Sequence, residues 1–203
     1  MDDFLGLLAM MAPSLLKGVI SLFIIVDPLG NIPIFISLTK EMDENQKRRT
    51  FHTATVVGLI LLMAFALTGQ HLLIFFGISV YSFMVAGGIL LLIIAIRLLM
   101  AGGWEEGPTS PESVGAVPIA CPLLVGPGAI TTTILTLQEA GIVVTTFSVV
   151  IIFAIVWLIL NFIDPIYRFL GRVGSLVISR VMALFIAAIA IQYIIGGIEH
   201  LIA

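Results

Sequence analysis

Two stretches rich in proline and glycine interrupt segments of this chain that are otherwise apolar enough to cross a membrane. The first runs Ile25-Val26-Asp27-Pro28-Leu29-Gly30-Asn31-Ile32-Pro33, and the second runs Leu124-Val125-Gly126-Pro127-Gly128-Ala129-Ile130-Thr131. A broken helix at membrane depth leaves backbone N–H and C=O groups that lipid cannot satisfy, so protein or a water-filled cavity must surround it. Paired breaks at corresponding places in two halves of a chain indicate the binding site of a transporter.

The composition of the chain places it in a membrane. Of its 203 residues, 60% are hydrophobic and 10% are charged, and the mean hydropathy is +1.23. Soluble domains carry about 25% charged residues, so we expect an integral membrane protein. The sequence has no basic stripe of the kind that binds nucleic acid. Its acidic start, at Asp2 and Asp3, argues against a signal peptide.

Six segments are long and apolar enough to span a bilayer, which takes about 20 mostly apolar residues. They cover residues 14–38, 51–75, 79–100, 117–138, 142–163 and 179–200. The first and the fourth of these segments contain the two breaks. We therefore expect an all-α membrane protein with six transmembrane helices, of which helices 1 and 4 are broken.

The segment 102–116 is rich in Gly, Pro, Ser, Thr and Glu, which predicts a linker. It would join two three-helix halves, 1–101 and 117–203, within one membrane domain. Because three crossings is an odd number, the second half would enter from the opposite side, giving an inverted repeat. Two weak sequence matches between the halves support this repeat. The first break resembles the second, and Phe76-Gly77-Ile78 resembles Leu170-Gly171-Arg172. Chance similarity between apolar helices is the alternative.

The basic residues predict how the chain is oriented in the membrane. All of the nine Lys and Arg except Lys17 fall near the loops that follow the first, third and fifth segments. Because cytoplasmic loops carry an excess of Lys and Arg, the 40–49 loop and the 102–116 linker should be cytoplasmic. We expect a multi-pass protein of the cell (inner) membrane, with both termini on the outer side. We interpret Lys17 as an anchor at the outer interface.

Asp27 is the first candidate for a chemical role. A carboxylate near mid-bilayer is costly unless it is paired or hydrated, and such groups mark ion, proton or substrate sites. Asp27 could instead cap the second half-helix. Beside it, Asn31 offers an amide donor and acceptor, and Gly30 lets the backbone approach a ligand closely. Pro28 and Pro33 predict where the helix stops and restarts.

The second break provides a different kind of site. The fourth segment is interrupted by Pro122, Gly126, Pro127 and Gly128. A helix that restarts here presents free N–H donors and about half a positive charge, which favours a carboxylate without a basic side chain. The hydroxyls of Thr131 and Thr132 could add donors. Alternatively, they could bond back to carbonyls of their own helix or serve the packing of one helix on another.

Signatures of enzymes are absent from the sequence. His52, His71 and His200 show no metal-ligand spacing, and neither a phosphate-binding loop nor a nucleophile with a base is present. We therefore expect no enzyme, and no cofactor beyond H⁺ or Na⁺ as a coupling ion. One deep carboxylate is few for a divalent cation, so a metal site is not expected.

Three motifs carry a resemblance to a known family. They are Asp27-Pro28-Leu29-Gly30-Asn31-Ile32-Pro33-Ile34-Phe35, then Phe76-Gly77-Ile78-Ser79 with Ala86-Gly87-Gly88-Ile89-Leu90-Leu91, and Pro118-Ile119-Ala120-Cys121-Pro122-Leu123-Leu124-Val125-Gly126-Pro127-Gly128-Ala129-Ile130. In these motifs the chain resembles the MarC family, which is also known through small neutral amino acid transporters of the SnatA type. The resemblance covers nearly the whole chain. Many family members have Asn at the position of Asp27, and a charge there could change the substrate, the ion coupling or the pH dependence.

These observations predict a secondary transporter of a small neutral amino acid such as glycine or alanine. The carboxylate of the substrate would lie at the helix N-terminus near residues 128–132, with its ammonium group near Asp27 and Asn31. Asp27 would couple transport to H⁺ or Na⁺. The alternatives are an exporter of another small solute or a metal ion, and a non-transporting membrane scaffold. The expected partners are the lipid bilayer and the substrate, without nucleic acid, and a homo-oligomer is compatible with the sequence.

Overall fold

Over the residues that it describes, 2–101, 119 and 124–202, the computed structural model of the protein is helical. Its helices are α1 (Asp2–Val26), α2 (Ile32–Leu38), α3 (Glu44–Phe75), α4 (Val80–Ala101), α6 (Pro127–Asn161) and α7 (Ile163–Ile202). The expected all-α class is therefore confirmed for this part of the chain. The expected 102–116 linker and Pro122 lie outside the described residues.

Four of the helices are long and apolar enough to cross a membrane by themselves. The qualifying stretches are Glu44–Phe75, Val80–Met100, Pro127–Asn161 and Val173–Ile202. The first predicted span differs, because it is divided between the apolar part of α1, Met11–Val26, and the 7 residues of α2. This division falls at the first Pro/Gly break, where the sequence predicts that the helix opens.

Single glycines with a positive φ bend the two longest helices. Gly141 has φ 79° and ψ 174° within α6, and Gly171 has φ 64° and ψ 178° within α7. Glycine adopts this conformation without the steric cost that a Cβ atom would bring. Gly141 separates residues 127–140 from 142–161, so α6 is a half-helix followed by a full-length one. That division matches the boundary predicted between the fourth and fifth apolar segments.

Local polar contacts fix where the second and third apolar segments begin. The Asp43 side chain accepts a hydrogen bond from the N–H of Gln46 at 2.8 Å, and the Gln46 side chain accepts one from the N–H of Asp43 at 3.0 Å. This reciprocal capping box starts α3 inside the polar 40–49 loop. At the start of α4, the N–H of Ser82 donates to the Ser79 hydroxyl at 3.0 Å.

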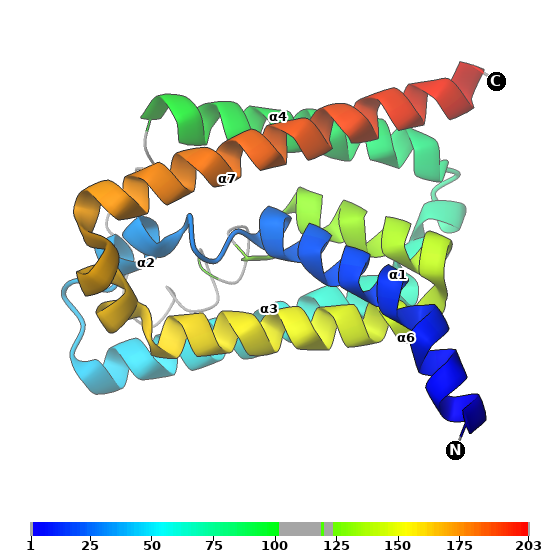
Figure 1. The fold of residues 1–203 in the computed structure, drawn as a ribbon. Coiled ribbons are helices and arrows are strands. Elements are labelled where there is room, and N and C mark those ends of the chain that lie inside the picture. Colours follow the sequence, from blue (N-terminus) through cyan, green and yellow to red (C-terminus); the bar gives the residue numbers. More distant parts are fainter. Residues whose placement is uncertain (1, 102–118, 120–123, 203) are drawn as a thin grey trace.

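The broken segments lie in the interior of the bundle. Figure 1 shows α4 and α7 side by side along one flank, with α3 and the second part of α6 along the opposite flank. Between these flanks run α1 and the first part of α6, which pack against each other. Both chain ends lie at one end of the bundle, and the turn between α2 and α3 lies at the other (Figure 1).

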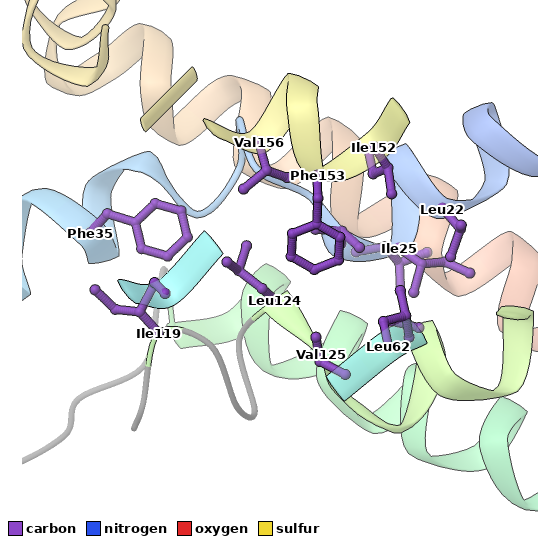
Figure 2. Packing of buried hydrophobic residues seen from close by; sticks show 14 of the residues in the cluster. Leu22, Ile25, Phe35, Leu62, Ile119, Leu124, Val125, Ile152, Phe153 and Val156 are labelled. Carbon is purple, nitrogen blue, oxygen red and sulfur yellow. The ribbon is translucent and has the colours of Figure 1, made fainter. Parts of the chain in front are cut away.

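Aliphatic and aromatic side chains fill the space around the breaks, as Figure 2 shows. The labelled members are Leu22, Ile25, Phe35, Leu62, Ile119, Leu124, Val125, Ile152, Phe153 and Val156. The outer surface of the bundle is also apolar, with Phe75 81% exposed and Phe169 89% exposed. An apolar surface of this extent is unusual for a soluble monomer and suits contact with lipid.

Candidate functional site

The first break begins where Asp27 ends α1 in the left-handed region of the backbone, with φ 45°. Among residues with a side chain, Asp and Asn tolerate this conformation best. The N–H of Asp27 still donates to the carbonyl of Phe23 at 3.0 Å, which is the last helical bond before the turn. Pro28 has no N–H to continue the pattern. The helix therefore stops at Asp27 for a local, stereochemical reason.

Side chains of the first break then brace the turn. Asp27 Oδ1 accepts a hydrogen bond from the N–H of Gly30 at 2.9 Å, and the amide of Asn31 donates to the carbonyl of Val26 at 3.2 Å. The N-cap position of α2 is held by Asn31, without a side-chain capping bond. Asp27 thus closes the turn between the two half-helices. It does not cap the second half-helix, although the sequence had left that alternative open.

The carboxylate of Asp27 retains an unused oxygen. Asp27 is 1% exposed, and its Oδ2 has no hydrogen-bond partner among the described residues. A buried polar oxygen that makes no hydrogen bond loses its hydration without compensation. A Cβ atom at Gly30 would overlap Oδ2 and lie 2.6 Å from Cγ of this carboxylate. Glycine at position 30 is therefore what allows the carboxylate to fold back over the turn.

The second break presents the start of a helix. Gly126 is the N-cap of α6, in extended conformation at φ −86° and ψ 174°, and Pro127 is the first helical residue. The first bond of the helix runs from the N–H of Ile130 to the carbonyl of Gly126 at 3.1 Å. The N–H groups of Gly128 and Ala129 precede that bond, at the positive end of the helix dipole.

The two breaks line one cavity, which we call the central cavity. Its volume is about 40 Å³, and its lining residues are Ile25, Asp27, Asn31, Leu91, Ile94, Leu98, Gly126, Gly128, Ala129 and Ile186. Asp27 from one break and a helix N-terminus from the other therefore border the same cavity, although about a hundred residues separate them along the chain. The aliphatic part of the lining, from α4 and α7, carried no signal that sequence reasoning recognised.

The two predicted threonines lie elsewhere. The hydroxyl of Thr131 donates to the carbonyl of Pro127 at 2.8 Å, so it bonds back to its own helix. Oγ1 of Thr132 lies 2.9 Å from the hydroxyl of Tyr193 on α7. Neither residue lines the central cavity. A Cβ atom at Gly87 would overlap the Thr131 side chain, so close packing of α4 also holds Thr131 in place.

A larger cavity lies at the end of the bundle that holds the chain termini, and we call it the terminus-side cavity. Its volume is about 440 Å³, and its lining residues are Ser14, Lys17, Gly18, Ser21, Met84, Thr132, Leu135, Thr136, Glu139, Ala140, Ile189, Gln192, Tyr193 and Gly196. In its wall, Lys17 of α1 forms an ion pair with Glu139 of α6. Sequence reasoning missed this pair, although Glu139 is the only acidic residue between positions 117 and 163.

A third cavity, the loop-side cavity, has a volume of about 300 Å³ and is lined by residues at the starts of α3 and α7 and at the end of α6. There Lys47 forms an ion pair with Asp164, and the Lys47 side chain is only 14% exposed. Among the described residues, no group of three His, Cys, Asp or Glu side chains gathers where it could hold a metal ion. Two separate ion pairs therefore join helices of the first and second halves of the chain.

Comparison with known proteins identifies the family. Residues 12–202 match the profile of the MarC family integral membrane proteins. The chain belongs to the MarC family. It is thus an integral membrane protein with several membrane-crossing helices, as its composition and its long apolar helices indicate.

Curated relatives of this MarC family member share most of their length with it. A UPF0056 membrane protein of Archaeoglobus fulgidus is 37% identical over 191 residues, which is 89% of this chain and 90% of the relative. The UPF0056 membrane protein YhcE of Escherichia coli K12 is 34% identical over 199 residues, covering 92% and 93%. A UPF0056 membrane protein of Aquifex aeolicus is 31% identical over 201 residues, covering 92% of each chain. No solved structure matches the sequence.

Proposed function

We propose that this MarC family member is a secondary transporter of a small neutral amino acid of the glycine or alanine type. The observation that carries the proposal is that both Pro/Gly breaks line the same cavity. Broken helices that meet inside a membrane protein supply binding groups from their exposed backbone, and transporters use them for substrates and coupling ions. A scaffold would gain nothing from an exposed backbone and a buried carboxylate at this depth. The resemblance to transporters of the SnatA type supports the substrate class.

The two breaks offer complementary groups to a zwitterion. In this proposal, the substrate carboxylate accepts hydrogen bonds from the N–H groups of Gly128 and Ala129, at the N-terminus of α6. The ammonium group lies near the carboxylate of Asp27 and the side-chain amide of Asn31. A cavity of about 40 Å³ holds about three water molecules at ~10–15 Å³ each. The substrate therefore enters the central cavity only after the two breaks move apart.

Asp27 is the proposed coupling group. Its Oδ2 is buried and has no hydrogen-bond partner among the described residues, so it is available to a proton or to Na⁺. Binding of either ion would neutralise a charge that is costly at this depth. Neutralisation would ease the movement of the turn between α1 and α2, which is how an ion gradient would drive the transport cycle.

The proposed architecture has six crossings in two inverted repeats, with α1 and α2 sharing the first crossing. Gly77, after α3, has φ 66°, and Gly171, in α7, has φ 64°, and these two positions would correspond in the proposed repeats. The common end of both termini also suits an even number of crossings (Figure 1). We place the end with the termini on the outer side of the cell (inner) membrane, because the Lys- and Arg-rich 40–49 loop lies at the other end of the bundle.

Uptake by proteoliposomes tests the proposed function. Labelled glycine and alanine would be supplied to vesicles that contain the purified protein, with and without imposed proton and sodium gradients, and protein-free vesicles would serve as the control. We expect accumulation that depends on one gradient. The Asp27→Asn variant keeps the shape of the side chain without its charge, and it should lose the dependence on the gradient. Absence of flux of either amino acid, from protein shown to be folded and inserted, would overturn the proposal.

A further inference from the structure

We propose that the terminus-side cavity is a recognition site for the zwitterionic backbone of an amino acid, in which Lys17 holds the carboxylate and Glu139 holds the ammonium group. This inference rests on the proposed function and deepens it, because it places a substrate site outside the central cavity. The terminus-side cavity is large enough for such a ligand. At about 440 Å³ this cavity falls within the range of roughly 300–1,000 Å³ that is usual for small-molecule sites.

The charges in this cavity match those of an amino acid. Lys17 supplies one positive group and Glu139 one negative group, and in the present structure they neutralise each other in an ion pair. The two side chains are 69% and 60% exposed, so the pair contributes little net stability and opens readily. A zwitterion placed between them replaces this ion pair by two, one between its carboxylate and Lys17 and one between its ammonium group and Glu139. The net charge of the cavity remains zero.

The same balance of charges disfavours ligands that carry a single charge. A simple amine would pair with Glu139 and leave the ammonium group of Lys17 without a partner. A simple carboxylic acid would pair with Lys17 and leave the carboxylate of Glu139 without one. The pair therefore selects for molecules that carry both charges, which is the property that separates a neutral amino acid from other small solutes.

The rest of the lining suits the remaining parts of such a ligand. The hydroxyls of Thr132 and Tyr193 and the amide of Gln192 offer hydrogen bonds, and Met84 and Leu135 offer apolar contact to a small side chain. These groups come from helices of both halves of the chain. The site is therefore assembled only in the folded bundle.

The terminus-side cavity lies beside the central cavity along α1 and α6. Ser21 lines it, and Ile25, one helical turn further along α1, lines the central cavity. On α6, Gly128 lines the central cavity, and Thr132, one turn further along, lines the terminus-side cavity. One turn of a helix advances about 5.4 Å. The two cavities therefore follow one another along the same pair of helices. Lys17 and Glu139 themselves lie about 15 Å along these helices from the breaks.

Equilibrium binding of labelled alanine to the full-length, detergent-solubilised protein tests this site. Unlabelled ethylamine and propionate would compete as the singly charged analogues. We expect Lys17→Ala to weaken alanine binding about tenfold or more and to let ethylamine compete far better than it does against the wild type. Glu139→Ala should weaken alanine binding similarly and favour propionate instead. Lys17→Arg, which keeps the charge, should retain most of the affinity.

Lys40→Ala is the matched control. Nζ of Lys40 lies 3.9 Å from Oε1 of Glu41, in an exposed ion pair. This pair belongs to the loop between α2 and α3, at the other end of the bundle. This variant should bind alanine like the wild type. An unchanged alanine affinity in Lys17→Ala and Glu139→Ala would overturn the inference. So would an equal loss in both variants without opposite changes in the preference for ethylamine and propionate, since that pattern would mark a purely structural pair.

The binding assay and the uptake assay separate this inference from the proposed function. Alanine binding that depends on Lys17 and Glu139, without any flux in proteoliposomes, would support the site and overturn the transporter. Gradient-driven uptake with an unchanged half-saturation concentration in Lys17→Ala would support the transporter and overturn the site. Absence of alanine binding by the folded wild-type protein would overturn the site.

Discussion

The hydroxyl of Tyr193 and Oγ1 of Thr132 lie 2.9 Å apart, which joins the last helix of the bundle to the half-helix that starts at the second break. Thr132 is 1% exposed, so its hydroxyl depends on this partner. Both residues line the terminus-side cavity, one helical turn from the N-terminus of α6. The contact therefore holds the first part of α6 against α7, one helical turn beyond the residue, Gly128, that lines the central cavity.

Tyr193→Phe should lower the free energy of unfolding by about 1 kcal/mol, because the buried hydroxyl of Thr132 loses its partner. The measurement is thermal or denaturant unfolding in detergent. Tyr81→Phe is the matched control, since it keeps the ring that stacks on His200 at a centroid distance of 4.5 Å. Equal losses of stability in the two variants would show that the contact between Thr132 and Tyr193 has no special weight.

Gly30→Ala should abolish transport while the protein still folds. The new Cβ atom would lie 2.6 Å from Oδ1 and Cγ of Asp27, so the carboxylate must leave its place over the turn. The measurement is gradient-driven uptake, together with an unfolding curve to confirm the fold. Gly174→Ala is the control, because among the described residues a Cβ atom there meets only Leu170, at 3.4 Å, and the residue lies within α7. Wild-type uptake by Gly30→Ala would show that the position of the Asp27 carboxylate does not matter.

Gly128→Leu should weaken substrate binding by filling the central cavity and covering the start of α6. Even a Cβ atom at Gly128 would overlap the side chain of Leu91 and lie 3.0 Å from Cγ2 of Ile25. The smaller change Gly128→Ala should be rescued in part by Leu91→Ala, because the second substitution returns the lost space. Binding of labelled alanine to the single and double variants measures this coupling. Strictly additive effects would contradict the packing argument.

Asp164→Asn should destabilise the protein more than Glu139→Gln does. The Lys47 side chain is 14% exposed and the Asp164 side chain 41%, so this pair is less exposed than that of Lys17 and Glu139, and losing Asp164 leaves Lys47 with a less well solvated charge. The exposed pair of Lys17 and Glu139 should contribute only ~0–1 kcal/mol. Unfolding curves of the two variants in one detergent make the comparison. A larger loss in Glu139→Gln would reverse this ranking of the two ion pairs.

The positions of the breaks could be predicted from the sequence, because the causes are local. Proline removes a donor, glycine removes a Cβ atom, and Asp accepts the positive φ that ends α1 at Asp27. The boundary at Gly141 follows in the same way, since only a short polar and glycine-containing stretch separates the fourth and fifth apolar segments. The meeting of the breaks is different, because it depends on how the helices pack.

Contacts between distant residues could not be predicted from the residues alone. Lys17 and Glu139 are 122 positions apart, and each has a sufficient explanation by itself as a charge near a membrane interface. Thr131 and Thr132 show the same limit at close range. They are adjacent and chemically identical, yet one bonds to its own helix and the other to Tyr193. Successive residues of a helix point about 100° apart, so only the placement of the neighbouring helices decides between these outcomes.

The small size of the central cavity has a consequence for the electrical insulation of the membrane. An ion that keeps its hydration shell meets a space of about 40 Å³ whose lining on α4 and α7 is aliphatic, with Leu91, Ile94, Leu98 and Ile186. Stripping water from an ion beside such side chains costs far more than thermal energy supplies. In this conformation the described lining therefore opposes the passage of hydrated ions past the polar turn. Flux would then be limited by how often the helices move apart, and a steeper gradient would raise it only up to that rate.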